Sequence, residues 1–192
     1  ELGVIPAGTE LPPRNPGDPA WDDLSEEERT VYARFMEAYA GFTEHPDEQI
    51  GRLVEFLKDH GEFENTVIYL LSDNGGAPEA GPEGNFAHPY RDTMTIRDMH
   101  ERLDDLGSPN SQPLYQRAWA MASSAPFKYY KLWPFNGGVR TPLIISWPQE
   151  IRRPGLRTQF LDVIDISPTA LDIAGLEQPA VFDGVCQIPL HG

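Results

Sequence analysis

The sequence has little cysteine, little positive charge and no long apolar run. Its 192 residues include one cysteine, Cys186, which excludes an internal disulfide framework. No apolar run approaches the roughly 18 residues of a membrane helix, so we expect no membrane span. The sequence shows no basic segment followed by an apolar one, the pattern that would mark a signal peptide. Fifteen Lys and Arg against 30 Asp and Glu give a net charge of −15, which argues against nucleic acid as the main partner.

What is present is enough apolar material for a core, at 40% of the residues. The acidic excess is uneven: residues 1–108 carry 24 acids and 8 bases, whereas residues 109–192 carry 6 acids and 7 bases. A solvated helical face and a surface loop explain such an excess, although a cation site could use a few of the carboxylates. The chain begins at Glu1 without Met, and we expect it to be part of a longer protein. Compartment and oligomeric state do not follow from the sequence.

The first 20 residues are rich in proline and glycine and predict an extended arm. A capping box formed by Ser25 and Glu28 then predicts the start of a helix. Apolar residues at helical spacing continue to Leu57, and Gly61 supplies the stop. Pro46 lies within this pattern and predicts a kink or a break.

Two apolar runs predict strands, at residues 66–71 and 142–147. The first is apolar at every position from Val67, which is typical of a strand buried in a parallel sheet with helices on each side. Between the strands lies a long loop, 75–127, of the kind that is functional or carries short helices. Ser167 and Pro168 predict the N-cap and first residue of a last helix, which Gly175 ends. This order of elements predicts an α/β layered domain.

Asp73 and Asn74 directly follow the first strand, where ligands gather in parallel α/β sheets. Their oxygens are the hard ligands that Ca²⁺ and Mg²⁺ prefer, and Gly75 and Gly76 allow a sharp turn. Two residues cannot complete a site of roughly six to eight ligands, so others must come from elsewhere. A plain turn is the alternative, because Asp, Asn and Gly all favour turns.

A second feature runs from Lys128 to Pro142 and combines lysines, aromatic residues and a glycine pair. Lys128 and Lys131 could hold an anion in a partly desolvated pocket. The alternative is a surface loop whose aromatic residues pack on the domain. Four aromatic residues near Lys131 could line a pocket for an aryl group or belong to the core: Tyr129, Tyr130, Trp133 and Phe135.

Together these segments resemble the sulfatase family, with a bacterial arylsulfatase as the nearest type. Ser72-Asp73-Asn74-Gly75-Gly76 is similar to the family's later metal-ligand segment. Lys131, followed by Gly137-Gly138-Val139-Arg140-Thr141-Pro142, is similar to its downstream lysine and Gly-Gly-[Ile/Val]-Arg-x-Pro segment. The stretch 162–175 resembles the helix that follows in the family. The likeness runs from about Leu11 to Gly192.

The resemblance implies a partial alkaline-phosphatase-like α/β/α sandwich. It divides the chain into the arm, 1–20, and the C-terminal portion of a catalytic domain, 21–192, with a C-terminal subdomain starting near 180–192. It implies hydrolysis of a small-molecule sulfate ester at a Ca²⁺ site, or in some members Mg²⁺. Asp73 and Asn74 would be metal ligands, and Lys131 would contact the sulfate and stabilise the leaving group.

The family's nucleophile, a formylglycine made from Cys in a Cys-x-Pro-Ser-x-Arg-like motif, does not match this sequence. Cys186 has proline at +3 instead of +2 and no following Arg, so we expect a core or loop thiol. We therefore expect the nucleophile in a missing N-terminal part and an inactive isolated chain. None of the five histidines sits in a family motif, and only His88 lies in the loop after the glycines. Asn136 also differs from the family pattern, in which Glu or Gln is commoner just before the glycine pair.

Two other readings stay open at this point. One is a phosphonate monoester or phosphodiester hydrolase of the alkaline phosphatase superfamily, because the site parts overlap. The other is a non-catalytic relative that binds anions, or a structural fragment. The upstream nucleophile motif would distinguish all three.

Overall fold

The computed structural model describes residues 6–87, 94–177 and 179–188. They fall into two compact units, unit 1 within residues 1–152 and unit 2 within residues 153–192. No helix among these residues is both long enough and apolar enough to cross a membrane. Unit 1 contains these helices, 3-10 turns and strands: η1 (Trp21–Asp23), α1 (Glu26–Asp59), η2 (Phe63–Asn65), β1 (Ile68–Leu71), α2 (Ile96–Glu101), η3 (Leu103–Asp105), α3 (Arg117–Ser123), α4 (Asn136–Val139) and β2 (Leu143–Ser146). Unit 2 contains η4 (Val163–Asp165), α5 (Ile166–Ile173), β3 (Val181–Phe182) and β4 (Val185–Cys186).

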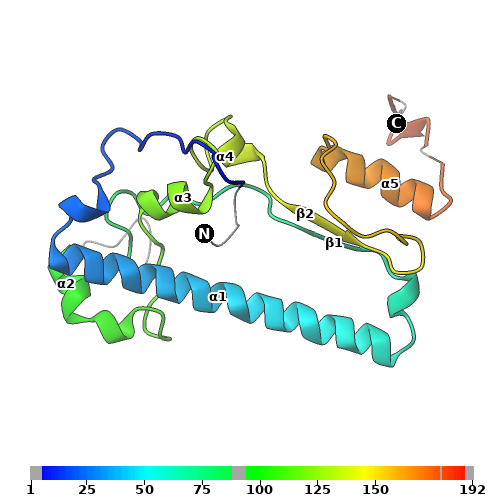
Figure 1. Ribbon diagram of the computed structural model, residues 1–192. Coiled ribbons are helices and arrows are strands. Elements are labelled where there is room, and N and C mark those ends of the chain that lie inside the picture. The colour runs from blue at the N-terminus through cyan, green and yellow to red at the C-terminus, as the bar shows by residue number, and fades with distance from the viewer. Residues whose placement is uncertain (1–5, 88–93, 178, 189–192) are drawn as a thin grey trace. The chain divides into compact units, whose positions relative to one another are not determined.

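The longest element, α1, begins and ends where the sequence predicts. The Ser25 hydroxyl accepts a hydrogen bond from the Glu28 N–H at 3.1 Å, and the Glu28 carboxylate accepts one from the Ser25 N–H at 2.7 Å. The helix ends before Gly61, whose φ of 72° reverses the chain. Of the kink or break predicted at Pro46, the break is wrong, because α1 continues through it as one helix (Figure 1). A long helix can lose one backbone hydrogen bond while the turns on both sides persist.

The hydrophobic core lies against the N-terminal half of α1. Val31 and Phe35 on α1 are almost fully buried, and Met99 of α2, which packs against α1, is equally so. Leu24, just before α1, and Tyr32 on α1 also belong to the core. The other buried apolar residues come from the loop segments that follow β1: Phe86, Leu106, Tyr115, Ala120 and Tyr130. The loop predicted over 75–127 thus carries two short helices, α2 and α3, and supplies most of the core that is not on α1.

The two strands of unit 1 form an antiparallel pair, with Ile68 opposite Ser146 and Leu71 opposite Leu143 (Figure 1). The prediction of a buried parallel strand is therefore wrong for the described residues. Leu70 and Leu71 are 41% and 40% exposed. The reason lies in the connection, since a parallel neighbour needs a crossover to the far end of the sheet. Here the loop returns to the end of β1 from which it left.

Unit 2 is small and built from local structure. The helix α5 begins at Ile166, one residue before the predicted cap at Ser167, because η4 leads directly into it. An Asp162–Asp165 capping box starts that turn, and Gly175 follows the helix end with a φ of 65°. Strands β3 and β4 form an antiparallel hairpin. Cys186 lies on β4, free and exposed, so it is a surface thiol of a hairpin and not a core residue.

Candidate functional site

The structure joins the two sequence segments that carry the predicted site. The Gly75 N–H donates to the Gly138 carbonyl at 3.0 Å, and the Lys131 N–H donates to the Gly76 carbonyl at 3.1 Å. Next to β2, the Thr141 hydroxyl donates to the Ser72 carbonyl at 2.7 Å. Residues 72–76 and 131–141, about 60 positions apart in sequence, are therefore fixed side by side at one end of the β1–β2 pair.

Glycine is required at this junction because the backbones approach too closely for side chains. A Cβ placed on Gly75 would lie 1.7 Å from the Gly137 carbonyl oxygen. One on Gly137 would lie 1.9 Å from the Tyr129 oxygen, and one on Gly76 would lie 2.6 Å from the Ala120 oxygen. Each distance is below any real Cβ contact, so none of the three positions can carry a side chain. The close approach of Gly75 to Gly137 interlocks the glycine pairs 75–76 and 137–138.

Asp73 and Asn74 lie at the start of this junction. Asp73 is exposed and Asn74 is half-buried. The Asn74 amide donates to the Gly75 carbonyl at 2.9 Å, and the Ser72 hydroxyl donates to the Asn74 carbonyl at 2.9 Å. The first bond uses the amide N–H and leaves the Asn74 side-chain oxygen for other partners. Local bonds of this kind also satisfy the turn interpretation, so the turn and a ligand role are compatible.

The donor chemistry fits a hard cation, but this chain supplies only part of a coordination sphere. A carboxylate and an amide oxygen suit Ca²⁺ or Mg²⁺, which bind oxygen ligands. Among the residues that the structure describes, no group of three or more His, Cys, Asp or Glu is placed to hold a metal ion. Asp73 and Asn74 could therefore hold a metal only together with ligands from outside this group.

The Lys131 side chain lies beside an acid that the sequence analysis did not identify. Its ammonium is 2.5 Å from a Glu79 carboxylate oxygen, Oε1, and the two side chains are 35% and 26% exposed. The other oxygen, Glu79 Oε2, is shut off from solvent without a hydrogen-bond partner in the described part of the chain. No motif marks Glu79, because its contact with Lys131 depends on the path of the loop after Gly76.

The backbone on both sides of Lys131 is unusual. Tyr129 and Leu132 have φ values of 60° and 80°, in the left-handed region that L residues other than Asn and Asp seldom adopt. Tyr129 stacks on Trp133, with ring centroids 4.6 Å apart and an interplanar angle of 14°. Tyr130 is buried in the core. The aromatic residues near Lys131 thus divide between core packing and a surface stack that holds this strained turn.

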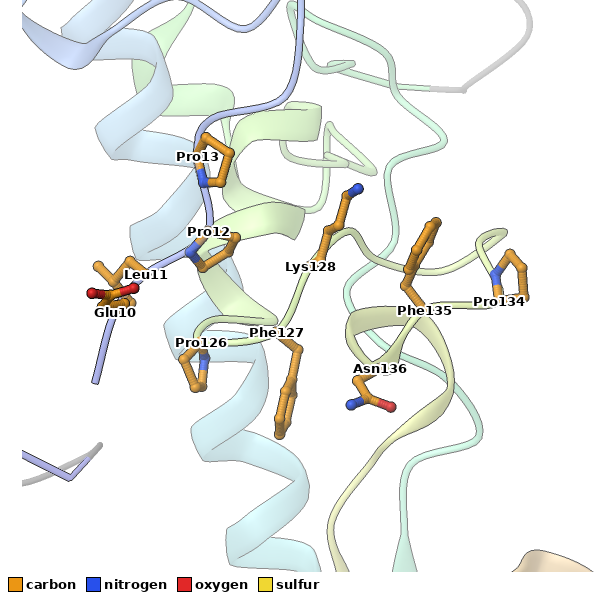
Figure 2. Close-up of a pocket in the computed structure, with 10 residues that line it drawn as sticks. All are labelled: Glu10, Leu11, Pro12, Pro13, Pro126, Phe127, Lys128, Pro134, Phe135 and Asn136. Atoms are coloured by element: carbon orange, nitrogen blue, oxygen red, sulfur yellow. The ribbon is translucent and has the colours of Figure 1, made fainter. Parts of the chain in front are cut away.

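Lys128, the other predicted anion-binding residue, points to a different place. Its ammonium lies 4.7 Å from the Phe135 ring centroid and 5.0 Å from that of Tyr129. Figure 2 shows Lys128 among residues of an open groove of about 580 Å³ between the arm and this segment. The groove is lined by Glu10, Leu11, Pro12, Pro13, Pro126, Phe127, Lys128, Pro134, Phe135 and Asn136. Lys131 is not among these residues, so the two lysine side chains lie in different surroundings.

Three tyrosines of the core have raised pKa values. Burial, aided by the charges of Glu28 and Glu83, raises the pKa of Tyr32 to about 12. Burial also raises the pKa of Tyr115 and of Tyr130 above the usual value. These hydroxyls hold their protons at neutral pH and are not bases. The remaining predicted candidate, His88, lies outside the described residues.

Comparisons with known proteins agree with this arrangement. The sequence pattern of the family described as "Sulfatase" matches residues 10–176. An uncharacterised sulfatase of Schizosaccharomyces pombe is 36% identical over 183 residues, which cover 93% of this chain and 32% of the relative. An arylsulfatase of Klebsiella aerogenes is 32% identical over 178 residues, 92% of this chain and 37% of the relative. The human N-acetylgalactosamine-6-sulfatase is 26% identical over 145 residues, 74% of this chain and 21% of the relative.

The chain spans about a third of the length of the first two relatives. The family match includes both interlocked segments, from Ser72 to Gly76 and from Lys131 to Pro142. With that pattern covering most of the sequence, this chain belongs to the sulfatase family.

Proposed function

We propose that the full-length protein hydrolyses sulfate esters of the aryl type and that this chain contributes part of its active site. The single observation that carries the proposal is the pair of backbone hydrogen bonds, Gly75 to Gly138 and Lys131 to Gly76. These bonds bring the Asp73-Asn74 segment and the Lys131 segment together in a sulfatase family member. The Klebsiella relative, an arylsulfatase, supports the aryl type.

Asp73 and Asn74 would hold Ca²⁺, or Mg²⁺, together with ligands from elsewhere in the full-length protein. Both offer side-chain oxygens on a turn that the interlocked glycines keep rigid. A bound divalent cation would polarise a sulfate oxygen and offset negative charge in the transition state. This part of the proposal rests on donor chemistry and on family resemblance.

Lys131 would contact the sulfate and offset charge that develops on the leaving oxygen. A lysine ammonium has three donors, so it can keep its contact with Glu79 and still donate to a sulfate oxygen. Preorganised donors of this kind stabilise charge best where they do not have to rearrange. The backbone bond from Lys131 to Gly76 provides such preorganisation.

The nucleophile, which the family resemblance gives as formylglycine, would lie outside this chain. Cys186 does not fit that role, because it is exposed on the β4 hairpin in unit 2 and lacks the flanking motif. We therefore propose that the 192-residue chain alone does not turn over sulfate esters. We also propose that the full-length protein has the alkaline-phosphatase-like α/β/α sandwich, of which β1 and β2 form a part.

The test of this function is comparative kinetics on the full-length protein. An aryl sulfate should be hydrolysed with a higher kcat/KM than a phosphonate monoester or a phosphodiester with the same leaving group. Faster hydrolysis of either phosphorus ester would favour the other branch of the superfamily. Hydrolysis of none of the three would favour a non-catalytic relative that binds anions. Turnover of the aryl sulfate by the 192-residue chain would contradict the role assigned to the missing nucleophile.

The metal ligands are tested by Ca²⁺ titration calorimetry on the same protein. Asp73→Ala should weaken Ca²⁺ binding by at least about 10-fold, since loss of even an outer partner of a metal ligand costs this much. Asp104→Ala is the matched control, because Asp104 is an exposed acid of η3 outside the junction. Equal Ca²⁺ affinity of Asp73→Ala and wild type would contradict the ligand role.

A further inference from the structure

Glu79 stands out among the acids of unit 1 because it is half-buried and faces a family-motif lysine. Its Oε1 lies 2.5 Å from the Lys131 ammonium. Its Oε2 is buried without a hydrogen-bond partner among the described residues. Keeping a carboxylate oxygen away from water costs free energy, so an acid in this position points to a role for the pair beyond solubility.

The same short segment holds Lys131 by its backbone and by its side chain. The Gly76 carbonyl accepts the Lys131 N–H, and Glu79, three residues later, contacts the Lys131 ammonium. Gly76 is itself anchored, because its N–H donates to the buried Ser124 hydroxyl at 3.1 Å and its Cα faces the Ala120 backbone. The segment that begins at the expected metal ligands therefore fixes where Lys131 points.

The lysine side of the contact is constrained as well. Tyr129 and Leu132 hold left-handed backbone conformations on both sides of Lys131, so the backbone that carries the lysine follows a strained turn. A lysine has four rotatable side-chain bonds and loses rotamer freedom when it is fixed. A fixed carboxylate partner supplies part of that ordering before the substrate arrives.

From these contacts we propose that Glu79 is a positioning residue for Lys131, which orients its ammonium toward the sulfate of the substrate. That the ammonium faces a sulfate rests on the proposed function. That Glu79 positions Lys131 rests on the ion pair alone. Glu79 acts through Lys131 and does not touch the reacting atoms. The outer partners of site residues in other enzymes act in the same way, by fixing the direction of the group that makes the contact.

The positioning itself is tested without activity, by amine acylation of the full-length protein and peptide mass spectrometry. The ion pair protects the Lys131 amine, so Glu79→Gln and Glu79→Ala should each raise its acylation rate about threefold to fivefold, the range that pairs of this exposure produce. Glu83→Ala is the matched control, because Glu83 is an exposed acid of the same loop. An unchanged rate in both Glu79 variants would overturn the positioning role, whether or not the protein hydrolyses sulfate esters.

The consequence for catalysis is tested by a double-mutant cycle on kcat/KM for an aryl sulfate. Glu79→Ala should lower kcat/KM about 10-fold, in the range for loss of an outer partner. In a Lys131→Ala background, Glu79→Ala should not lower kcat/KM further. With Lys131 present, Glu79→Asp should lower kcat/KM less than Glu79→Ala does. A merely structural role predicts the same loss in both backgrounds, and that result would overturn the proposal. Absence of wild-type turnover would instead contradict the proposed function, while the acylation rates still decide the positioning.

Discussion

At the scale of single residues, the site depends on four glycines and one acid. Gly75 cannot carry a side chain because the Gly137 carbonyl is too close, and Gly137 cannot because the Tyr129 carbonyl is too close. The close approach of Gly75 to Gly137 brings the Asp73 segment to the Lys131 segment. Glu79, four residues after Gly75, contacts the Lys131 ammonium. The identities of the motif residues are readable in the sequence, whereas the contact between Glu79 and Lys131 is not.

Gly75→Ala should therefore destabilise the protein strongly. The added Cβ would meet the Gly137 carbonyl 1.7 Å away, and the backbone must shift, at a cost of about 3 kcal/mol. Gly51→Ala is the control, since Gly51 lies within α1 with nothing within 4 Å of its Cβ position. This second change should stabilise the protein by about 0.5–1 kcal/mol, because alanine favours helix. Urea unfolding of the full-length protein would show opposite shifts; a similar midpoint for both variants would count against the interlock.

At the scale of elements, local signals predict helix ends well and strand pairing poorly. The Ser25–Glu28 capping box and the stop at Gly61 need only neighbouring residues, and both are confirmed. The antiparallel pairing of β1 with β2 joins residues far apart in the sequence, and the hydrogen bond between Gly75 and Gly138 beside it spans 63 positions. An apolar run alone does not reveal such a contact, which is why the parallel prediction failed.

Pro46 is a second place where an element differs from its local signal. It lacks the N–H that a helix interior uses, yet α1 passes through it without a break. Pro46→Ala should restore that hydrogen bond and stabilise the protein by about 2 kcal/mol, less than the full propensity difference of about 3 kcal/mol. The loss of proline also frees the unfolded chain, which accounts for the reduction.

The matched control for Pro46→Ala is Glu48→Ala, an exposed change two residues further along α1. It should change the unfolding free energy by less than about 0.5 kcal/mol. Thermal unfolding of the full-length protein would separate the two variants. A Pro46→Ala protein less stable than wild type would show that the proline is favoured in this helix for a reason outside the backbone.

At the scale of the whole molecule, the core of unit 1 is concentrated near the N-terminal half of α1. Farther along, α1 and the β1–β2 pair expose apolar side chains, including Phe56 at 56% and Ile144 at 58%. The resemblance implies that these strands belong to a larger α/β/α sandwich, and that remains a prediction. The strands are apolar, as the sequence shows, but their burial depends on partners that a single apolar run does not identify.

The buried tyrosines make the stability of unit 1 sensitive to alkaline pH. The pKa of Tyr32 is raised to about 12 in the folded protein, against about 10 for an unfolded tyrosine. A raised pKa means that stability is fully present below pH 10 and falls as the pH rises toward 12. Tyr32→Phe should therefore reduce the loss of unfolding free energy between pH 10 and pH 12, with Tyr115 and Tyr130 still contributing in the same direction. An identical alkaline profile for Tyr32→Phe and wild type, measured by urea unfolding, would contradict the assignment.

The site as a whole was more predictable than the fold around it. Residue type indicates Asp73 and Asn74 as candidate ligands, and the family resemblance singles out Lys131; the structure places all three on segments joined by backbone hydrogen bonds. Their roles as metal ligands and sulfate contact stay predictions. Glu79 and the left-handed turns at Tyr129 and Leu132 could not be foreseen, because neither leaves a pattern in the sequence.

The most direct test is the kcat/KM of the full-length protein for an aryl sulfate in Lys131→Ala and Lys128→Ala variants. Both changes remove one lysine from the same segment, but Lys128 faces the groove and its aromatic neighbours instead of Glu79. Lys131→Ala should lower kcat/KM by about 100-fold or more, as loss of a transition-state donor does, whereas Lys128→Ala should stay within about threefold of wild type. Wild-type kcat/KM in Lys131→Ala, or an equal loss in both variants, would contradict the assignment of Lys131 to the sulfatase site.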